Sequence, residues 1–146
     1  MGTSRVVRFL KADGVTILIV VALIAVYAVL RTPGDKFDTI SDLEAALRSG
    51  TPTVIEFYSN NCSICLKSKP EVDRIERDLQ RQASVLRLNV KDTVGRALAG
   101  RWGVQGVPTF VVVDQQGAIQ YASAGAPNAD AIKAAVAELG SAHSAP

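Results

Sequence analysis

Residues 53 to 65 read Thr-Val-Ile-Glu-Phe-Tyr-Ser-Asn-Asn-Cys-Ser-Ile-Cys. The first six residues are mostly β-branched or aromatic, which predicts a strand over 53–58. The next three, Ser59 to Asn61, have side chains that cap helix N-termini, so we expect a long helix from about Cys62 to Gln82. The two cysteines therefore stand where a strand gives way to a helix.

Strands and helices alternate along the rest of the domain. Such alternation predicts a sheet covered by helices on both faces, and the turn near Gly117 predicts an antiparallel hairpin at its end. The expected fold class is α/β, with a central mixed sheet between two layers of helices. The expected helices are 41–49, 62–82, 93–101 and 128–139, and the expected strands are 53–58, 85–90, 109–114 and 119–123.

Local patterns refine two of the expected helices. Ser41 and Glu44 have the spacing of a capping box and predict the start of the first helix, and Gly50 predicts its end. In the long helix, acid-first pairs such as Asp73 with Arg77 lie four residues apart. Pairs at this spacing face each other on a helix surface, so we expect these charges to form a solvated face.

Cys62 and Cys65 stand three residues apart at the start of the long helix. A helix N-terminus favours negative charge, so Cys62 is the expected nucleophile. Cys65, one turn further into the helix, is the expected resolving thiol, which attacks the mixed disulfide on Cys62. An inert structural disulfide and a metal site are the alternatives. Zinc takes about four ligands, whereas the chain has two Cys and one His, and haem attachment takes a His where Leu66 stands. We therefore expect no metal and no cofactor.

Glu56 is the one charged residue in a strand that we expect to be covered on both faces. A buried carboxyl is costly when ionised, so its pKa should rise. Such a group is suited to exchange protons with the Cys65 thiol through water. The alternative is a Glu on an exposed edge, or one paired with a basic residue such as Arg87.

These motifs together resemble the thioredoxin family. The matching positions are the Cys-x-x-Cys pair, Pro70 five residues after it, Glu56 six residues before Cys62, the run Gly-Val-Pro-Thr from Gly106 to Thr109, and Gly125. The resemblance covers Phe37 to about Leu139. It implies a thioredoxin-like fold in which Glu56 relays protons and Pro70 bends the long helix. A break between two helices is the alternative reading of Pro70.

The resemblance also implies a substrate site. Pro108 should be cis and face the disulfide, and the backbone of Val107 should pair with a strand of the substrate. A trans proline before a strand is the alternative. Asn61 stands where the family usually has an aromatic residue, and Ser63-Ile64 stands where it usually has Gly-Pro. Because this intervening pair helps to set the reduction potential, the direction of exchange stays open.

The N-terminal part of the chain is strongly apolar. Gly14 to Leu30 are 17 residues without a charge. As a helix they span about 25 Å, which is at the short end for a bilayer but workable if Lys11 and Arg31 reach the interface. A cleavable signal peptide and a soluble core helix are the alternatives. The expected organisation is an N-terminal tail over 1–13, a transmembrane anchor over 14–31, a linker over 32–36, a thioredoxin-like domain over 37–140 and a disordered tail over 141–146.

Charge differs between the two parts of the chain. Residues 1–36 carry five basic and two acidic residues, and residues 37–146 carry eleven basic and twelve acidic ones. Basic residues stay on the cytoplasmic side, so a single-pass anchor would place the N-terminus in the cytoplasm and the domain in the periplasm or at the cell exterior. A signal peptide would send the domain to the same compartment. The alternation of basic and acidic residues on the domain argues against a nucleic-acid partner.

The sequence thus predicts a membrane-anchored thiol-disulfide oxidoreductase that reduces disulfides of extracytoplasmic proteins. Its expected partners are protein thiols and disulfides, the lipid bilayer around 14–31 and a membrane-embedded electron donor. The resemblance points to cytochrome maturation or the repair of wrongly paired cysteines. A disulfide oxidase or isomerase is the first alternative, marked by a reduction potential of about −120 mV instead of about −270 mV. The second is a non-catalytic interaction module whose disulfide is structural, which would form no mixed disulfides.

Overall fold

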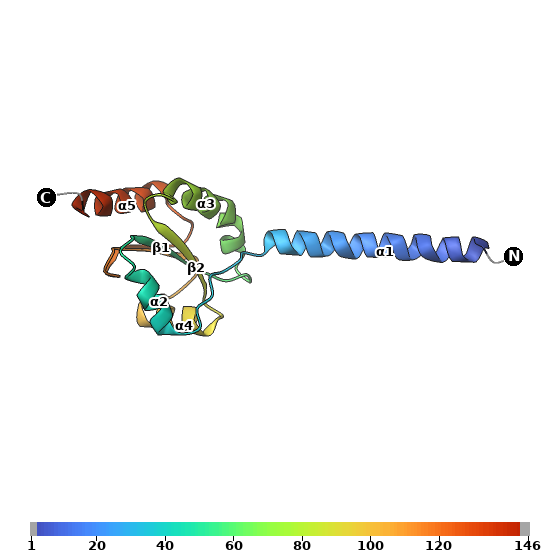
Figure 1. Ribbon diagram of the computed structural model, residues 1–146, viewed down its shortest axis with the longest axis horizontal. Helices are drawn as coiled ribbons and strands as arrows, with labels where there is room; N and C mark the ends of the chain where they lie inside the picture. The colour runs from blue at the N-terminus through green and yellow to red at the C-terminus, as the bar shows by residue number, and fades with distance from the viewer. Residues whose placement is uncertain (1–2, 144–146) are drawn as a thin grey trace. The chain divides into compact units, whose positions relative to one another are not determined.

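The computed structural model describes residues 3–143, and the side chains of residues 14–141. Its contacts divide the chain into two units, one ending at Thr32 and one beginning at Pro33. The first unit is α1 (Thr3–Leu30), which Figure 1 draws as one continuous helix. Residues 3–13, expected as a tail, are therefore helical, whereas Met1 and Gly2 lie outside the described residues.

The large apolar side chains in the described part of α1 are exposed. Those from Val15 to Leu30 are between 47% and 74% exposed. Within the part of the chain that the structure describes, no helix is long and apolar enough to cross a membrane. The anchor over 14–31 stays a prediction.

The second unit is built on a four-stranded mixed sheet with the strand order β2-β1-β3-β4. β1 pairs in parallel with β2 and antiparallel with β3, and β3 pairs antiparallel with β4. The α/β class and the hairpin at the end of the sheet are confirmed. The strands are β1 (Thr53–Tyr58), β2 (Ser84–Asn89), β3 (Thr109–Val113) and β4 (Ile119–Ala124), and the helices are α2 (Ile40–Leu47), α3 (Ser63–Leu79), α4 (Thr93–Arg101) and α5 (Ala129–His143).

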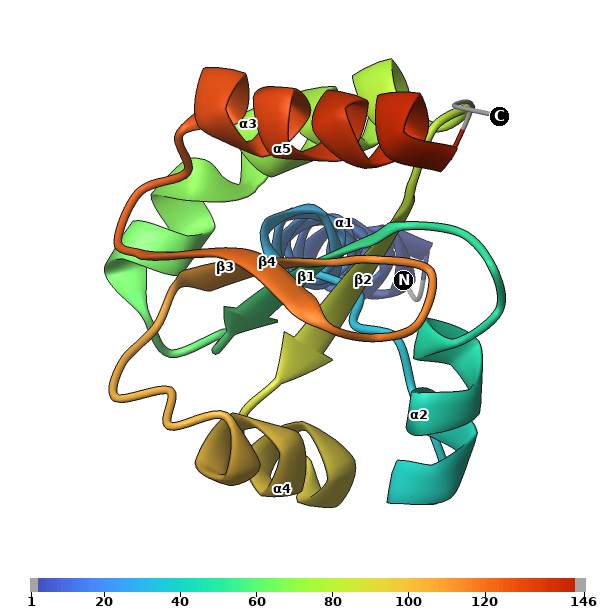
Figure 2. The ribbon, with the colours of Figure 1, turned by 90° about the vertical axis from the view of Figure 1, so that its left-hand side faces the viewer.

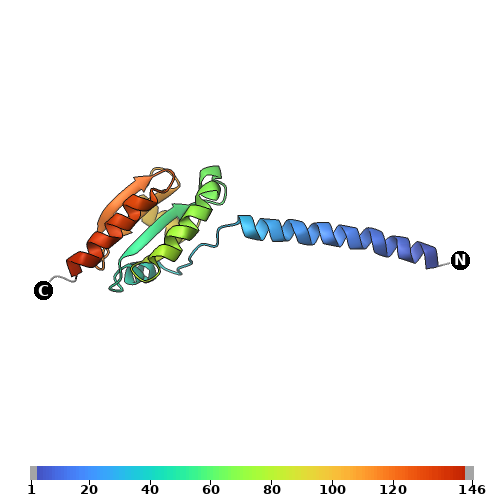
Figure 3. The ribbon, with the colours of Figure 1, turned by 90° about the horizontal axis from the view of Figure 1, so that it is seen from above.

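Helices cover both faces of the sheet. α3 and α5 lie side by side on one face, and α2 and α4 lie on the other (Figure 2 and Figure 3). Alternate residues of β1 enter the two layers: Phe57 packs toward α2 and α4, and Val54 packs toward α3 and α5. Every residue of β1 is buried, as in strands covered on both sides. Glu56 has the same parity as Val54 and so lies on the α3 side.

The start of α2 differs from the predicted one. The capping box is formed by Thr39 and Asp42, because Thr39 Oγ1 accepts from the Asp42 N–H at 3.1 Å and Asp42 Oδ2 accepts from the Thr39 N–H at 3.1 Å. The predicted box of Ser41 and Glu44 is therefore wrong, and Glu44 pairs instead with Arg101 of α4. The earlier start brings Ile40 into the helix, where its side chain packs against the core.

Helix ends also move by a few residues. α3 is one helix that contains Pro70, so the break into two helices does not occur. It ends at Leu79, three residues before the predicted end. α5 continues to His143, so the first part of the predicted disordered tail is helical, and residues 144–146 lie outside the described residues.

Part of the predicted linker is fixed against the sheet. The Asp35 N–H donates to the Arg87 carbonyl oxygen at 2.9 Å, and the Arg87 N–H donates to Asp35 Oδ2 at 2.7 Å. β2 is an edge strand, whose outward N–H and C=O groups are open to such partners. Gly34 also lies close to the sheet, because a Cβ there would be 2.4 Å from Tyr58 Oη. The residues next to Pro33 thus belong to the folded unit.

Candidate active site

The turn after β1 places Cys62 at the N-cap of α3. The Cys62 N–H donates to the Ser59 carbonyl oxygen at 3.1 Å, and the Asn61 N–H donates to Ser59 Oγ at 3.2 Å. Cys62 Sγ in turn accepts from the Cys65 N–H at 3.2 Å. The Cys62 sulfur is thereby held at a helix N-terminus, where negative charge is stabilised.

The two cysteines differ in access to solvent. Both are free thiols, Cys62 half-buried and Cys65 only 2% exposed. Burial, together with the hydrogen bond to Cys62, raises the pKa of Cys65 to about 12. Cys62 is therefore the sulfur that an incoming disulfide can reach, and Cys65 keeps its proton until a base removes it. Among the described residues, no three His, Cys, Asp or Glu side chains gather to hold a metal ion.

The loop before β3 lies against Cys62, although 45 residues separate them. The Val107–Pro108 peptide bond is cis, and the Cys62 thiol donates to the Val107 carbonyl oxygen at 3.5 Å. The loop is closed by two further bonds: Thr109 Oγ1 donates to the Gly106 carbonyl oxygen at 2.7 Å, and the Gly125 N–H donates to the Pro108 carbonyl oxygen at 2.8 Å. The fold thus brings the run from Gly106 to Thr109 to the cysteine pair.

Glu56 is buried on the α3 side of β1. It is 2% exposed, and among the side chains that the structure describes its Oε2 atom has no hydrogen-bond partner. Burial raises the pKa of Glu56 from 4.5 to about 7, against the opposing effect of the Arg87 charge. The charge of Glu56 in turn contributes to the raised pKa of Cys65. The two groups therefore interact, and at neutral pH Glu56 is poised between its two protonation states.

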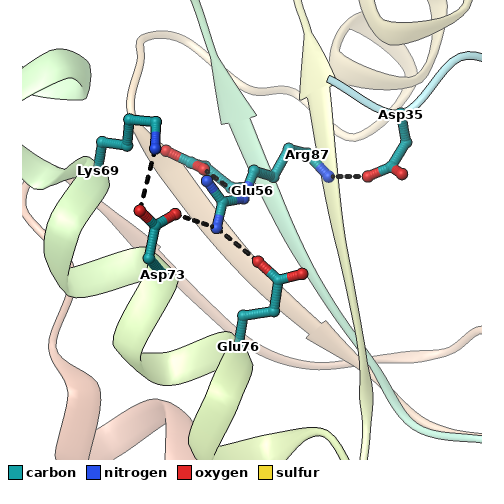
Figure 4. Close-up of polar contacts among 6 residues, drawn as sticks. All are labelled: Asp35, Glu56, Lys69, Asp73, Glu76 and Arg87. Carbon is teal, nitrogen blue, oxygen red and sulfur yellow. Dashed lines mark hydrogen bonds and ion pairs between the residues drawn. The ribbon is translucent and has the colours of Figure 1, made fainter. Parts of the chain in front are cut away.

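Arg87 is the centre of a cluster of charges beside Glu56 (Figure 4). Its Nε atom lies 3.9 Å from Glu56 Oε2, whereas its Nη2 atom lies 2.7 Å from Asp73 Oδ1 and 2.6 Å from Glu76 Oε2. Lys69 Nζ contacts the other oxygen of Asp73 at 3.0 Å. The alternative of a Glu56–Arg87 pair is thus realised only at the limit of ion-pair distance, and the closer partners are on α3.

The predicted solvated face of α3 is only partly correct. Asp73 does not pair with Arg77 but with Lys69 and the buried Arg87, whose side chain is 7% exposed. The sequence signal was the spacing of Lys69, Asp73 and Glu76 at i, i+4 and i+7, which lines them up on one side of a helix. What the spacing does not reveal is the basic residue on a neighbouring strand that they face.

Several curated proteins are similar to part of this chain. Thioredoxin-like protein HCF164, chloroplastic, from Arabidopsis thaliana is 36% identical over 74 residues, which are 51% of this chain and 28% of that protein. The thiol:disulfide interchange protein TxlA homolog from Synechocystis is 31% identical over 75 residues, 51% of this chain and 42% of that protein. Protein disulfide-isomerase erp38 from Neurospora crassa is 32% identical over 94 residues, 64% of this chain and 24% of that protein. The chain thus spans less than half the length of these relatives, and their names support a thiol-disulfide oxidoreductase.

Solved structures share the fold. A mutant thioredoxin from Halobacterium salinarum is 26% identical with a TM-score of 0.58, covering 68% of this chain and 83% of that one. Thioredoxin from Trypanosoma brucei brucei is 13% identical with a TM-score of 0.64, covering 75% of this chain and 92% of that one. The family model described as Thioredoxin matches residues 36–138. Because that match takes in the sheet, the cysteine pair and the cis-proline loop together, the chain belongs to the thioredoxin family.

Proposed function

We propose that this protein is a membrane-anchored thiol-disulfide oxidoreductase that reduces disulfides of proteins outside the cytoplasm. The observation that carries the proposal is the position of Cys62: its sulfur is reachable, accepts the Cys65 N–H and lies beside the Val107 carbonyl oxygen. A nucleophile, a second thiol one helical turn away and a backbone edge for the substrate are thus within one small region.

In the first step the Cys62 thiolate attacks one sulfur of a substrate disulfide. A bond forms between Cys62 Sγ and that sulfur, the substrate S–S bond breaks, and the second substrate sulfur leaves as a thiolate that takes up a proton. The helix N-terminus stabilises the negative charge of Cys62 before the attack. The product is a mixed disulfide.

In the second step Cys65 resolves the mixed disulfide. The Cys65 thiolate attacks Cys62 Sγ, the intermolecular bond breaks, and the substrate is released with both its sulfurs reduced by the two electrons of the cysteine pair. Burial holds the pKa of Cys65 at about 12, so the step needs a base. Glu56, with its pKa at about 7, is the proposed acceptor of that proton through water.

The substrate is proposed to bind along the cis-proline loop. A strand of the substrate that pairs with the backbone of Val107, next to Pro108, would place its disulfide over Cys62. Ile64 and Leu66, 51% and 37% exposed, add apolar surface next to the cysteines. Backbone pairing and apolar contact discriminate little between sequences, which suits an enzyme that acts on several proteins, including immature cytochromes and proteins with wrongly paired cysteines.

The anchor is proposed on the apolar surface of α1. Large exposed apolar side chains on a helix are unfavourable in water, and burial in a bilayer would remove them from water. The 17 uncharged residues fall short of the about 20 of a typical span, so the proposal needs Lys11 and Arg31 to reach the interfaces. A domain so placed outside the cytoplasm would be recharged by a membrane-embedded dithiol donor.

The test uses the full chain in detergent micelles with dithiothreitol as the reductant and a protein disulfide as the substrate. Cys62→Ser should eliminate turnover. Ser63→Ala, the control substitution at the next position, should leave the turnover rate unchanged. Once dithiothreitol has been removed, Cys65→Ser mixed with the protein disulfide should accumulate the mixed disulfide on Cys62, which a gel without reductant detects. Undiminished turnover in Cys62→Ser would refute the proposal, and a reduction potential of about −120 mV for the cysteine pair would reverse the direction of exchange.

Topology is tested separately. In intact cells, a membrane-impermeant maleimide should label Cys62 in the Cys65→Ser variant if the domain lies outside the cytoplasm. Labelling only after the membrane is broken would place the domain inside. Release of the chain by carbonate washing would contradict the anchor.

A further inference from the structure

The buried guanidinium of Arg87 is shared unequally between three carboxylates. It contacts Asp73 at 2.7 Å and Glu76 at 2.6 Å, but approaches Glu56 only to 3.9 Å (Figure 4). Glu56 is its neighbour in the register of β1 and β2, so a closer pair between them would need no change of fold. The two α3 carboxylates therefore hold the guanidinium close to α3 and away from Glu56.

The charges of the cluster balance without Glu56. Lys69 and Arg87 carry two positive charges, and Asp73 and Glu76 carry two negative ones. Although burial opposes it, hydrogen bonds from Lys69 and Arg87 lower the pKa of Asp73, so this carboxylate stays ionised at neutral pH. An ionised Glu56 would give the cluster a net negative charge, and it would be offset only by the distant Arg87 and Lys69 charges.

The backbone of Arg87 is fixed as well. Its N–H donates to Asp35 Oδ2 and its carbonyl oxygen accepts from the Asp35 N–H, so the edge of β2 is held at this residue. A fixed backbone and two carboxylates at the tip leave the long side chain little freedom. Movement of the guanidinium toward Glu56 would require its ion pairs with Asp73 and Glu76 to break.

We propose that Asp73 and Glu76 are positioning residues of the proton relay: they hold the Arg87 guanidinium on α3 and thereby leave Glu56 able to exchange a proton at neutral pH. The inference rests on the proposed function, because only a relay gives this proton exchange a use. The charged or titratable groups that face Glu56 are Arg87 from β2 and Lys69, Asp73, Glu76 and Cys65 from α3; its register neighbour on β3 is the apolar Phe110.

The experiment follows the ionisation of Glu56 directly. The full chain, with carbon-13 in its glutamate carboxyl groups, is titrated by NMR in micelles, and Glu56→Gln identifies the signal. We expect Asp73→Asn and Glu76→Gln each to lower the titration midpoint of Glu56 by about one pH unit, a tenfold change in its ionisation ratio. Asp78→Asn is the matched control, because Asp78 lies on the same helix and pairs with Lys133 of α5.

A direct electrostatic effect of the lost charge would also lower the midpoint, so two comparisons separate it from positioning. The Glu76 side chain is 52% exposed, and solvent screens its direct effect on Glu56. An unmoved midpoint in Glu76→Gln would therefore overturn the proposal. In an Arg87→Gln background the shift caused by Asp73→Asn should largely disappear, and a shift of full size there would also overturn it.

Failure of this inference is distinguishable from failure of the proposed function. The titration of Glu56 does not depend on turnover. The control Asp78→Asn should move neither the titration nor the pH profile of disulfide reduction. In Asp73→Asn and Glu76→Gln the acidic limb of that profile should shift in the same direction as the titration, whereas a purely structural role would change stability without moving either.

Discussion

Replacement of Glu56 by Gln tests the buried carboxyl through the pH dependence of stability. The substitution keeps the size of the side chain and removes its ionisation. In the folded protein burial raises the pKa of Glu56 from 4.5 to about 7, so the native state holds this proton more tightly than the unfolded chain does. Between pH 4.5 and about 7 the wild-type protein should therefore lose stability as the pH rises, because unfolding releases the proton.

The magnitude follows from the two pKa values of Glu56. At about 1.4 kcal/mol for each pH unit, the interval from 4.5 to about 7 corresponds to about 3 kcal/mol in the free energy of unfolding. The loss is complete just above pH 7 and absent below pH 4. The difference in stability between Glu56→Gln and wild type should therefore grow by about 3 kcal/mol, in favour of the variant, from pH 4 to pH 8.

Urea unfolding of the full chain in micelles measures this difference. Trp102, the single tryptophan, packs edge-to-face on the buried Phe57 with ring centroids 6.0 Å apart, so its fluorescence reports the core. Other titrating groups, including the cysteines, are present in both proteins and largely cancel in the difference. Stability curves that run parallel from pH 4 to pH 8 would show that the pKa of Glu56 is not raised by burial.

Two pairs of matched substitutions test local features of the fold by the same unfolding assay. Gly95→Ala should destabilise by about 1–3 kcal/mol, because its Cβ would lie 2.3 Å from the Asn89 carbonyl oxygen, whereas Gly100→Ala, in open space on the same helix, should stabilise by about 0.5–1 kcal/mol. Equal effects would contradict the packing of α4 on β2. Thr39→Ala should cost about 1 kcal/mol, and Ser41→Ala should cost less than about 0.5 kcal/mol; the reverse order would restore the capping box predicted from the sequence.

The parts of the fold that the sequence predicts are those whose signals are local. A β-branched and aromatic run followed by capping side chains identifies the junction of β1 and α3, and with it the position of Cys62. Glu56 could be recognised as buried because it interrupts a strand that is otherwise apolar. The resemblance to a family added what no local pattern carries, the approach of Val107 and Pro108 to a cysteine 45 residues away.

The parts that the sequence does not predict depend on choices between equivalent local patterns. Thr39 with Asp42 and Ser41 with Glu44 both have the spacing of a capping box, and the packing of Ile40 on the core favours the earlier one. Asp73 likewise has basic residues on both sides along α3. Asp73 pairs with Arg87, because a buried cation is costly without a carboxylate partner. Arg87 lies beside Glu56 through the parallel pairing of β1 with β2, which no local pattern in α3 reveals.

The same physics ties the chemistry of the site to its stability. A carboxyl that accepts a proton from Cys65 at neutral pH must have a raised pKa, and the raised pKa is the reason that its ionised form weakens the fold. A close pair with Arg87 would stabilise the ionised form of Glu56 and so remove this loss of stability. It would also lower the pKa of Glu56 below neutral pH, where the carboxylate is a weaker base for the Cys65 proton. Asp73 and Glu76 pair with the Arg87 guanidinium, so this buried cation has carboxylate partners without a close pair to Glu56. The pKa of Glu56 therefore stays raised. A variant that stabilises the protein at pH 8 by tightening the Glu56–Arg87 pair should therefore resolve mixed disulfides more slowly.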